Sequence, residues 1–447
     1  TNGIVKSVLQ GHSDRVRRAR FNRDTSETFD DGWGTLEQHA EGLALPPRTQ
    51  IIEEHAKSIL TSNQSPDIAF DLSINPYRGC EHGCVYCFAR PTHSYLNLSP
   101  GLDFETRIVA KVNAAQKLRE AFANRSYEPA MLNLGSATDA YQPVERKLLI
   151  TRGIVEVLAQ CSHAFSLVTK SAGVERDLDL IAPMAARGLV AVYVSLTTLD
   201  PALARIMEPR AASPQRRLQT IETLVAAGVP VGVSVSPVIP FINEPELERI
   251  LEAAARAGAS RAFSVVLRLP WEVNPIFQQW LNCHFPDRAA RVMARIRDMR
   301  GGSDYDARFG ARMVGQGVWA QLLRQRFDKC VARLGLDRER VALDLSQFRR
   351  PESAPRPTMA SSAPRGGMSK VAEHSLMSQA AAAQRDHVDA DDAAAQLLGH
   401  GQLDNREADR KERHEQDAAD KDQPVAQHRH ARHRDGYRAA SRHLCEP

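Results

Sequence analysis

The sequence predicts an α/β protein in which parallel strands alternate with helices. Two observations support this prediction: short runs rich in β-branched residues recur between residues 66 and 350, and helical patterns fill the intervals, at a spacing of about thirty residues. Six such units can form an open or partial barrel, or a doubly wound sheet. In either architecture ligands bind at the carboxyl ends of the strands, so functional residues are expected there.

Each predicted strand is a short, mostly apolar run. Continuous apolar runs are typical of strands that are covered on both faces, as in parallel sheets. The six runs are IAFDLSI (68–74), AMLNLGS (130–136), FSLVTK (165–170), VAVYVSL (190–196), PVGVSVS (230–236) and RAFSVVL (261–267).

The predicted helices show apolar residues at intervals of three or four. The clearest pattern covers residues 105–124, where one helical face is expected to carry Ile108, Val112, Ala115, Leu118 and Phe122. Further helices are expected at about 145–160, 175–187, 214–228 and 245–258.

Composition divides the chain into three parts. Residues 1–65 are polar and are predicted to be an N-terminal extension, residues 66–350 form the α/β domain, and residues 351–447 form a low-complexity tail. The tail has one aromatic residue, Tyr437, but eight of the fifteen histidines. A segment so poor in apolar side chains cannot offset the entropy of ordering it, so the tail is predicted to be disordered.

Composition also bears on location and redox state. The chain shows no apolar run suited to a signal peptide and no eighteen consecutive apolar residues, so we expect a cytoplasmic protein without a membrane partner. The formal net charge of +4 is too small to argue for nucleic-acid binding by itself. In a reducing compartment the seven cysteines are not expected to form disulfides, and closely spaced ones more often hold metal or perform redox chemistry.

Three of the cysteines, Cys80, Cys84 and Cys87, lie within eight residues in the stretch RGCEHGCVYCFAR, soon after the first predicted strand. Three soft thiolates suit an iron–sulfur cluster or zinc. His82 could complete a Cys3His zinc set, although its spacing from the cysteines is awkward for tetrahedral ligation. On a cubane cluster, three thiolates would leave one iron open to a substrate or cofactor.

The stretch CEHGCVYC has the CxxxCxxC spacing of radical S-adenosylmethionine (radical SAM) enzymes, with an aromatic residue, Tyr86, before the third cysteine. Over roughly residues 15–350 the sequence resembles that superfamily, and within it the branch of DNA repair photolyases related to spore photoproduct lyase. The resemblance rests on residues 75–105, on TDAYQPVE (138–145) and on residues 206–240. It implies a partial (β/α)6 TIM-like barrel of the radical SAM type.

The resemblance also implies cofactors and site residues. Cys80, Cys84 and Cys87 would ligate a 4Fe–4S cluster, whose fourth iron binds S-adenosylmethionine. Reductive cleavage of this cofactor would give a 5′-deoxyadenosyl radical that abstracts hydrogen from a substrate.

Seven further residues are implied to contact S-adenosylmethionine. For some of them a structural role explains the residue as well: Asp139 could be a helix cap, and each serine at a strand end could bind backbone groups. The contacts are Tyr86 for the adenine, Ser136, Thr138 and Asp139 for the ammonium, Ser195 and Ser236 for the ribose and carboxylate, and Arg210 for the carboxylate.

The sequence differs from spore photoproduct lyase in one respect, and this difference leaves the identity of the substrate open. Spore photoproduct lyase returns a hydrogen atom from a cysteine downstream of its cluster, whereas this chain has no cysteine between Cys87 and Cys161. We therefore predict a lyase-like radical enzyme of unknown substrate, with DNA or a DNA lesion as the candidate. Expected partners are a nucleic acid and an electron donor such as flavodoxin or ferredoxin, and we expect a monomer.

Two other classes of function stay open. The first is a zinc- or cluster-bearing nucleic-acid-binding module without radical catalysis. The second is an inactive product of a frameshift, suggested by the composition of residues 351–447.

Overall fold

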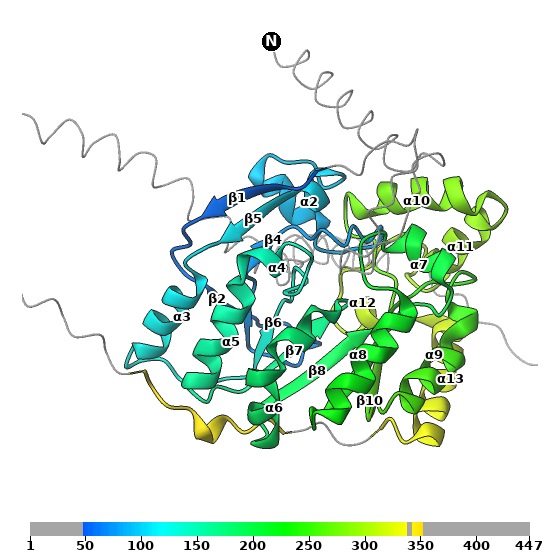
Figure 1. Ribbon diagram of the computed structural model, residues 1–447. Coiled ribbons are helices and arrows are strands. Elements are labelled where there is room, and N and C mark those ends of the chain that lie inside the picture. The colour runs from blue at the N-terminus through cyan, green and yellow to red at the C-terminus, as the bar shows by residue number, and fades with distance from the viewer. Residues whose placement is uncertain (1–47, 338–341, 352–447) are drawn as a thin grey trace, which may run out of the picture. The chain divides into compact units, whose positions relative to one another are not determined.

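The structure is a computed structural model that describes residues 48–337 and 342–351 (Figure 1). The disorder predicted for the C-terminal tail concerns residues outside this range, and so does most of the predicted N-terminal extension. No helix in the described part of the chain is both long and apolar enough to cross a bilayer.

The central element is a seven-stranded sheet with the strand order β10-β9-β8-β7-β6-β3-β2. Neighbouring strands from β3 to β10 are parallel, and β2 joins β3 in antiparallel orientation. The strands are β2 (Leu60–Ser62), β3 (Leu72–Ile74), β6 (Leu132–Leu134), β7 (Phe165–Thr169), β8 (Val190–Ser195), β9 (Val231–Val238) and β10 (Arg261–Val266).

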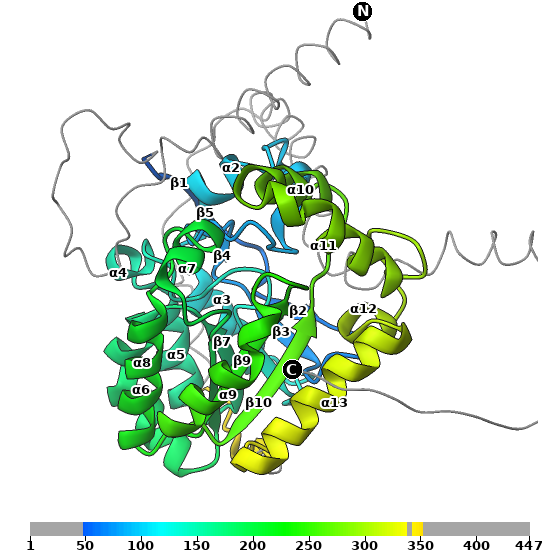
Figure 2. The ribbon, with the colours of Figure 1, turned by 90° about the vertical axis from the view of Figure 1, so that its right-hand side faces the viewer.

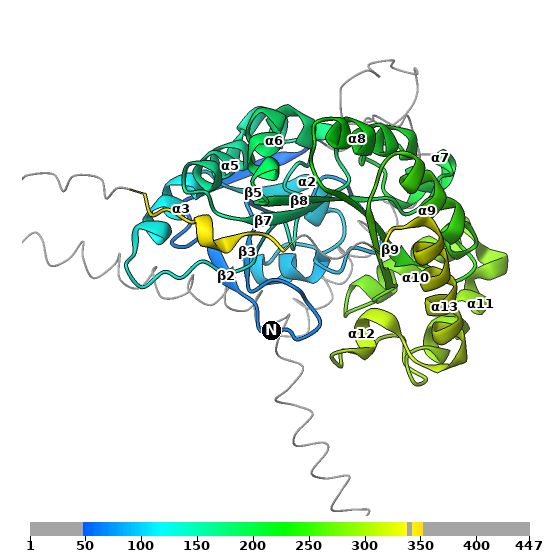
Figure 3. The ribbon, with the colours of Figure 1, turned by 90° about the horizontal axis from the view of Figure 1, so that it is seen from below.

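The six parallel strands confirm the predicted partial (β/α)6 barrel. They follow one another in chain order across the sheet, and among the described strands β10 pairs only with β9, so the barrel is not closed. The apolar runs that predicted the strands are buried because helices cover the sheet: Val192, Val194 and Val233 are at most 1% exposed. Seen from below, the helices form an outer arc around the strands (Figure 3).

The outer layer confirms the helices expected between residues 145 and 258. Gly228, in the left-handed conformation with φ +78°, follows the end of one of them. The layer consists of α4 (Glu145–Leu148), α5 (Ile150–Gln160), α6 (Leu178–Ala186), α8 (Pro214–Ala226) and α9 (Leu247–Arg256), with α3 (Ala114–Ala123) before them and α13 (Gly317–Leu334) beside β10 (Figure 2).

The single long helix predicted for residues 105–124 is wrong. The chain there forms α2 (Asp103–Thr106), β5 (Arg107–Lys111) and then α3. The RIVAK run has strand partners on both sides, β1 (Gln50–Glu54) in parallel and β4 (Tyr77–Arg78) in antiparallel orientation. This pairing overrides the helical pattern, so Ile108 is buried in a strand while Val112 is 37% exposed.

The strands β1 and β2 lie in residues that the sequence assigned to the polar extension. Their sequences, QIIEE and LTS, are short and half-exposed, which explains why composition alone did not separate them from a polar segment. The described part of residues 1–65 therefore belongs to the folded domain.

A second buried cluster lies beyond the carboxyl ends of the strands. It joins α7 (Pro201–Met207), α10 (Val273–His284) and α11 (Pro286–Asp298) around Trp280, which is fully buried. Cys84, Val85 and Tyr86 belong to the same cluster. The cysteine segment is thus packed into a core of its own.

Candidate functional site

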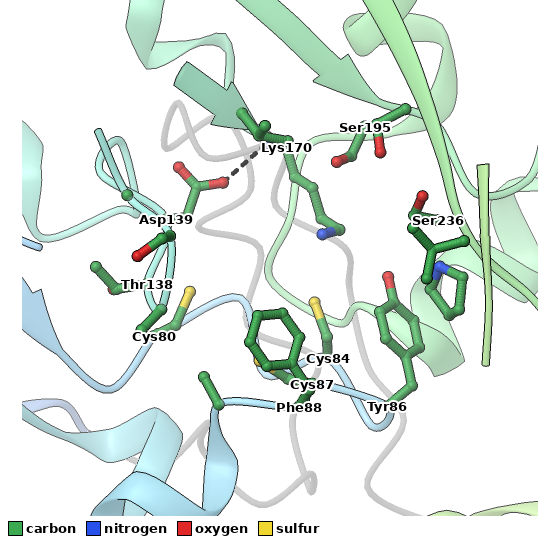
Figure 4. Close-up of a pocket in the computed structure, with 18 of the residues that line it drawn as sticks. Cys80, Cys84, Tyr86, Cys87, Phe88, Thr138, Asp139, Lys170, Ser195 and Ser236 are labelled. Carbon is green, nitrogen blue, oxygen red and sulfur yellow. Dashed lines mark hydrogen bonds between the residues drawn. The ribbon is translucent and has the colours of Figure 1, made fainter. Parts of the chain in front are cut away.

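A pocket of about 340 Å³ opens at the carboxyl ends of the parallel strands. It contains nine of the ten residues that the resemblance assigned to the cluster and to S-adenosylmethionine, and Figure 4 labels eight of them around one space. The nine are Cys80, Cys84, Tyr86, Cys87, Ser136, Thr138, Asp139, Ser195 and Ser236.

Glycines shape the loop that carries the three cysteines. Gly79 and Gly83 both adopt positive φ, +84° and +67°. A Cβ at Gly83 would lie 2.3 Å from a carboxylate oxygen of Glu105, and one at Gly79 would lie 2.7 Å from the carbonyl oxygen of Phe104. Only glycine combines this backbone conformation with such close approach.

A buried arginine fixes the same loop from behind. The Arg90 guanidinium is fully buried and donates to the carbonyl oxygens of Cys84 (2.9 Å) and Gly83 (3.0 Å). It also pairs with Glu105, with 3.1 Å between Nη2 and Oε1. Because an unpaired buried charge is costly, this network holds the loop in one conformation.

Two polar residues from the loop after β6 support the cysteine loop from the other side. Thr138 donates its hydroxyl proton to the Gly79 carbonyl oxygen at 2.6 Å. Ser136 bonds with the side chain of Asn75, with 3.1 Å between the amide nitrogen and the hydroxyl oxygen. Both residues line the pocket, yet their hydroxyl groups already bind protein atoms.

The cysteines are free thiols in a low-dielectric setting. Cys80 and Cys84 are buried, and burial raises the pKa of the Cys84 thiol to about 12. Burial, followed by the nearby Asp139, raises the pKa of Cys80 as well. Among the described residues no three His, Cys, Asp or Glu side chains are arranged around a point that could hold a single metal ion.

Asp139 forms an anchor between the loop after β6 and the end of β7. Its carboxylate accepts hydrogen bonds from the amides of Tyr141 (2.9 Å) and Lys170 (2.7 Å), and from the Thr169 hydroxyl (2.7 Å). His82 Nδ1 lies 3.3 Å from the same carboxylate. Burial opposes ionisation, but His82 and these hydrogen bonds lower the pKa of Asp139 to about 2.

Lys170 contributes a positive charge that the sequence analysis missed. Its side chain extends from the end of β7 toward the cysteine loop (Figure 4), with Nζ 5.8 Å from the centre of the Tyr86 ring. Burial lowers the pKa of Lys170, but the thiolate form of Cys84 and the Glu208 carboxylate outweigh burial and raise the pKa above its usual value. The amine is therefore protonated at neutral pH.

A buried acid orients Tyr86. The Tyr86 hydroxyl donates to Glu208, which also accepts from the Thr197 hydroxyl at 2.8 Å and pairs with the buried Arg217. Glu208 follows α7 and is fully buried. The ring of Tyr86 is thereby held against one wall of the pocket, with its polar end turned into protein.

Two serines lie near the carboxyl ends of β8 and β9. Ser195 is 3% exposed and lines the pocket. The Ser236 hydroxyl is buried and has no hydrogen-bond partner in the described structure. Because native proteins rarely leave a buried hydroxyl unpaired, this group is suited to receive a polar ligand.

Arg210 does not line the pocket with the other nine residues. Its Nη2 donates to the Glu105 carbonyl oxygen at 2.7 Å and lies 3.5 Å from the Glu105 carboxylate. The buried carboxylate of Glu105 attracts this arginine as it does Arg90. In the structure Arg210 thus supports the cysteine loop from outside.

The residues that sequence reasoning missed stand at recognisable positions. Lys170 is the last residue of the predicted strand FSLVTK, and Arg268 directly follows the run RAFSVVL. A search for charged residues at the carboxyl ends of predicted strands would have found both. Glu208 and Arg217 carry no such signal, because only tertiary packing brings them to Tyr86.

Comparison with known proteins gives the family. The model of the radical SAM superfamily matches residues 74–254. An uncharacterized protein of Mycobacterium tuberculosis is 38% identical over 240 residues, 53% of this chain and 71% of that protein. An uncharacterized protein of Methanocaldococcus jannaschii is 27% identical over 199 residues, which are 44% of this chain and 71% of that protein.

The chain belongs to the radical SAM superfamily. Members of this superfamily use a 4Fe–4S cluster and S-adenosylmethionine, so membership implies an enzyme with these cofactors. Among solved structures, spore photoproduct lyase complexed with dinucleoside spore photoproduct has a TM-score of 0.46 and 15% identity, covering 64% of this chain and 79% of that one.

Proposed function

We propose that Cys80, Cys84 and Cys87 hold a 4Fe–4S cluster and that S-adenosylmethionine binds beside it in the pocket. The observation that carries this proposal is the arrangement of three thiols on a rigid loop opposite Lys170 and the unpaired Ser236 hydroxyl. Three soft ligands leave one iron open. When bound, these groups supply a 5′-deoxyadenosyl radical for hydrogen abstraction.

The residues of the chain would hold the cofactor in place. Lys170 offers a cation to a carboxylate group, and Ser195 and Ser236 offer hydroxyl groups near the carboxyl ends of β8 and β9. The Tyr86 ring offers an apolar face to the adenine. Asp139 would contribute negative charge toward the ammonium, while its hydrogen bonds fix the backbone of Lys170.

We further propose a lyase-like reaction on a substrate that is a nucleic acid or a DNA lesion. The support is the resemblance of residues 75–105, 138–145 and 206–240 to the DNA repair photolyase branch. An electron donor such as flavodoxin or ferredoxin would reduce the cluster, and the enzyme would act as a cytoplasmic monomer.

An anaerobic assay tests the proposal. The purified, reconstituted protein is reduced in the presence of S-adenosylmethionine, with and without ultraviolet-damaged DNA, and 5′-deoxyadenosine is quantified. We expect a brown protein with four irons per chain and formation of 5′-deoxyadenosine. A colourless protein that binds zinc and forms none would refute radical catalysis.

A further inference from the structure

The lining of the pocket divides into a polar and an apolar part. The middle strands β6 to β9 contribute polar side chains, including Asp139, Lys170 and the serines. The other part is mostly apolar: it comes from the two open edges of the sheet, that is, the segment before β3, β10 with the residues that follow it, and α12 (Ala311–Val314), together with Phe88 of the cysteine loop. We call this part the edge subsite; it comprises Ile68, Phe70, Phe88, Phe263, Arg268 and Met313.

Arg268 is the one charged side chain of the edge subsite. Its hydrogen-bond contacts are weak: Nη1 lies 3.8 Å from the Met313 sulfur and Nη2 lies 3.5 Å from the Tyr305 hydroxyl. Nε is buried and has no partner in the described structure. A guanidinium with so few strong acceptors can bind an anion with little loss of existing bonds.

The carboxylates nearest in sequence to Tyr305 are already paired with other arginines. Asp304 pairs with Arg297 at 2.7 Å, and Asp306 pairs with Arg308 at 2.8 Å. Within the described residues, none of the ion pairs involves Arg268. The positive charge at this end of the pocket is therefore not neutralised by a direct contact.

The backbone that carries Arg268 is fixed by a second arginine. Arg300 donates to the Leu267 carbonyl oxygen at 2.8 Å, and the Leu267 amide bonds with the Val238 carbonyl oxygen at 3.1 Å. Burial, opposed by the charge of Asp306 and assisted by the positive charge of Arg268, lowers the pKa of Arg300 to about 10. Two guanidinium groups near each other create a positive potential that favours an anion.

Phe88 connects the edge subsite to the cysteines. It follows Cys87 directly, and the residue is 40% exposed. The Arg268 guanidinium carbon lies 5.2 Å from the centre of this ring, in the range of a cation–π contact. An aromatic surface beside a guanidinium is the combination with which proteins hold a base and its phosphate.

We propose that the edge subsite binds a nucleotide unit of the substrate, with the phosphate on Arg268 and the base against Phe88 and its apolar neighbours. This inference rests on the proposed function and adds the residues that recognise the substrate. The bidentate geometry of arginine suits two phosphate oxygens, and stacking tolerates any base.

Binding is measured anaerobically on the full-length, cluster-loaded protein by calorimetry. The ligands are thymidine, thymidine 5′-monophosphate, a single-stranded hexathymidylate and benzoate. We expect Arg268→Gln to weaken binding of the phosphate-bearing ligands about tenfold or more, since a charge-assisted hydrogen bond is lost. Arg268→Lys should recover part of the affinity, because lysine keeps the positive charge but lacks the planar guanidinium that donates two parallel hydrogen bonds.

The matched control is Arg333→Gln, which removes the same charge from an exposed position on α13, where Arg333 pairs with Glu252 at 2.7 Å. It should bind all ligands as the wild type does. Iron content and circular dichroism verify folding, and if Arg268→Gln fails to load iron the lysine variant carries the comparison.

Tighter binding of hexathymidylate than of the mononucleotide supports a nucleic-acid strand, and equal binding supports a free nucleotide. Unchanged affinity in Arg268→Gln, or preference for thymidine or benzoate, would overturn the inference. The 5′-deoxyadenosine assay is read separately, so failure of radical chemistry is distinguishable from failure of phosphate binding.

Discussion

The three cysteines illustrate how burial and reactivity oppose each other at single residues. The high pKa of Cys80 and Cys84 means that both thiols are protonated in the cluster-free protein at neutral pH. A metal ligand must be a thiolate, so loading iron has to displace these protons. The energy for deprotonation comes from the iron–sulfur bonds themselves.

Cys84→Ala is therefore expected to abolish cluster assembly without unfolding the domain. Cys84 belongs to the second buried cluster and not to the main core around the strands, so the change removes a ligand and one small side chain while the main core stays intact. Iron and sulfide analysis with circular dichroism measures both effects. The control is Cys330→Ala on α13, another buried free cysteine, which should keep its iron. Full iron and sulfide in Cys84→Ala would contradict the ligand assignment.

The lowered pKa of Asp139 predicts that the stability of the fold depends on pH. Its folded-state pKa, about 2, is below the ordinary value of 3.8, so ionised Asp139 stabilises the fold at pH values above about 4. This contribution, about 2 kcal/mol, is lost as pH falls from about 4 to about 2. The free energy of unfolding of cluster-free wild type and Asp139→Asn should differ at pH 5 and converge near pH 2. A difference that is constant with pH would show that the carboxylate is not responsible.

At the scale of elements, the cysteine loop depends on the space that its glycines leave. Gly83→Ala and Gly188→Ala place a side chain at similar φ, +67° and +71°, and both should lose about 1–2 kcal/mol of stability from backbone strain. Only Gly83→Ala also drives a Cβ into the Glu105 carboxylate, because nothing lies within 4 Å of a Cβ at Gly188. We expect urea unfolding to show a larger loss for Gly83→Ala, together with reduced iron content. Equal losses and normal iron in both variants would mean that the loop adjusts freely.

The strands could be predicted from the sequence because burial on both faces leaves a continuous apolar run, as in VAVYVSL. The helix predicted for residues 105–124 was wrong because the apolar residues of the RIVAK segment fit both the helical period and the strand period. The strand β1, with which this segment pairs, is distant in sequence. The cysteine spacing singled out three residues that line the pocket at the carboxyl ends of the strands. Glu208 and Arg217, by contrast, reach Tyr86 only through the packing of α7 and α8, which no local pattern encodes.

For the whole molecule, an ion pair connects the two edges of the open sheet. Arg312 of α12 pairs with Asp67, in the segment before β3, with 2.7 Å between Nε and Oδ2. The neighbours of these residues, Met313 and Ile68, line the pocket from opposite edges. The pair therefore closes the side of the partial barrel where the strands do not meet.

A double-mutant cycle with Asp67→Asn and Arg312→Gln measures this connection. Both side chains are at most 10% exposed, so we expect a coupling free energy of about 1–3 kcal/mol. Urea unfolding of the two single variants and the double variant gives the value. A coupling near zero would indicate that solvent screens the pair and that α12 is held by its apolar contacts alone.

The position at which the chain can be shortened follows from contacts at the base of the barrel. Residues 342–351 dock there: the Phe348 ring packs against Phe122 and Tyr127, with ring centres 5.4 and 5.5 Å apart. Arg350 donates to the Tyr127 carbonyl oxygen at 2.7 Å. This segment is thus part of the folded domain, whereas the composition of the following residues predicts no buried surface.

A chain ending at residue 352 should therefore unfold at the same temperature as the full chain and keep its cluster and cofactor cleavage. A chain ending at residue 341 is the matched control, and it should lose about 2 kcal/mol or more, because it exposes Phe122 and Tyr127 and deletes Phe348. Calorimetric melting and 5′-deoxyadenosine formation test both chains. If the cut at 352 lowered the melting temperature or abolished cofactor cleavage, residues 353–447 would have to contribute to the fold or cover the pocket. Rapid proteolytic trimming to a brown fragment of about forty kilodaltons would instead agree with a dispensable tail.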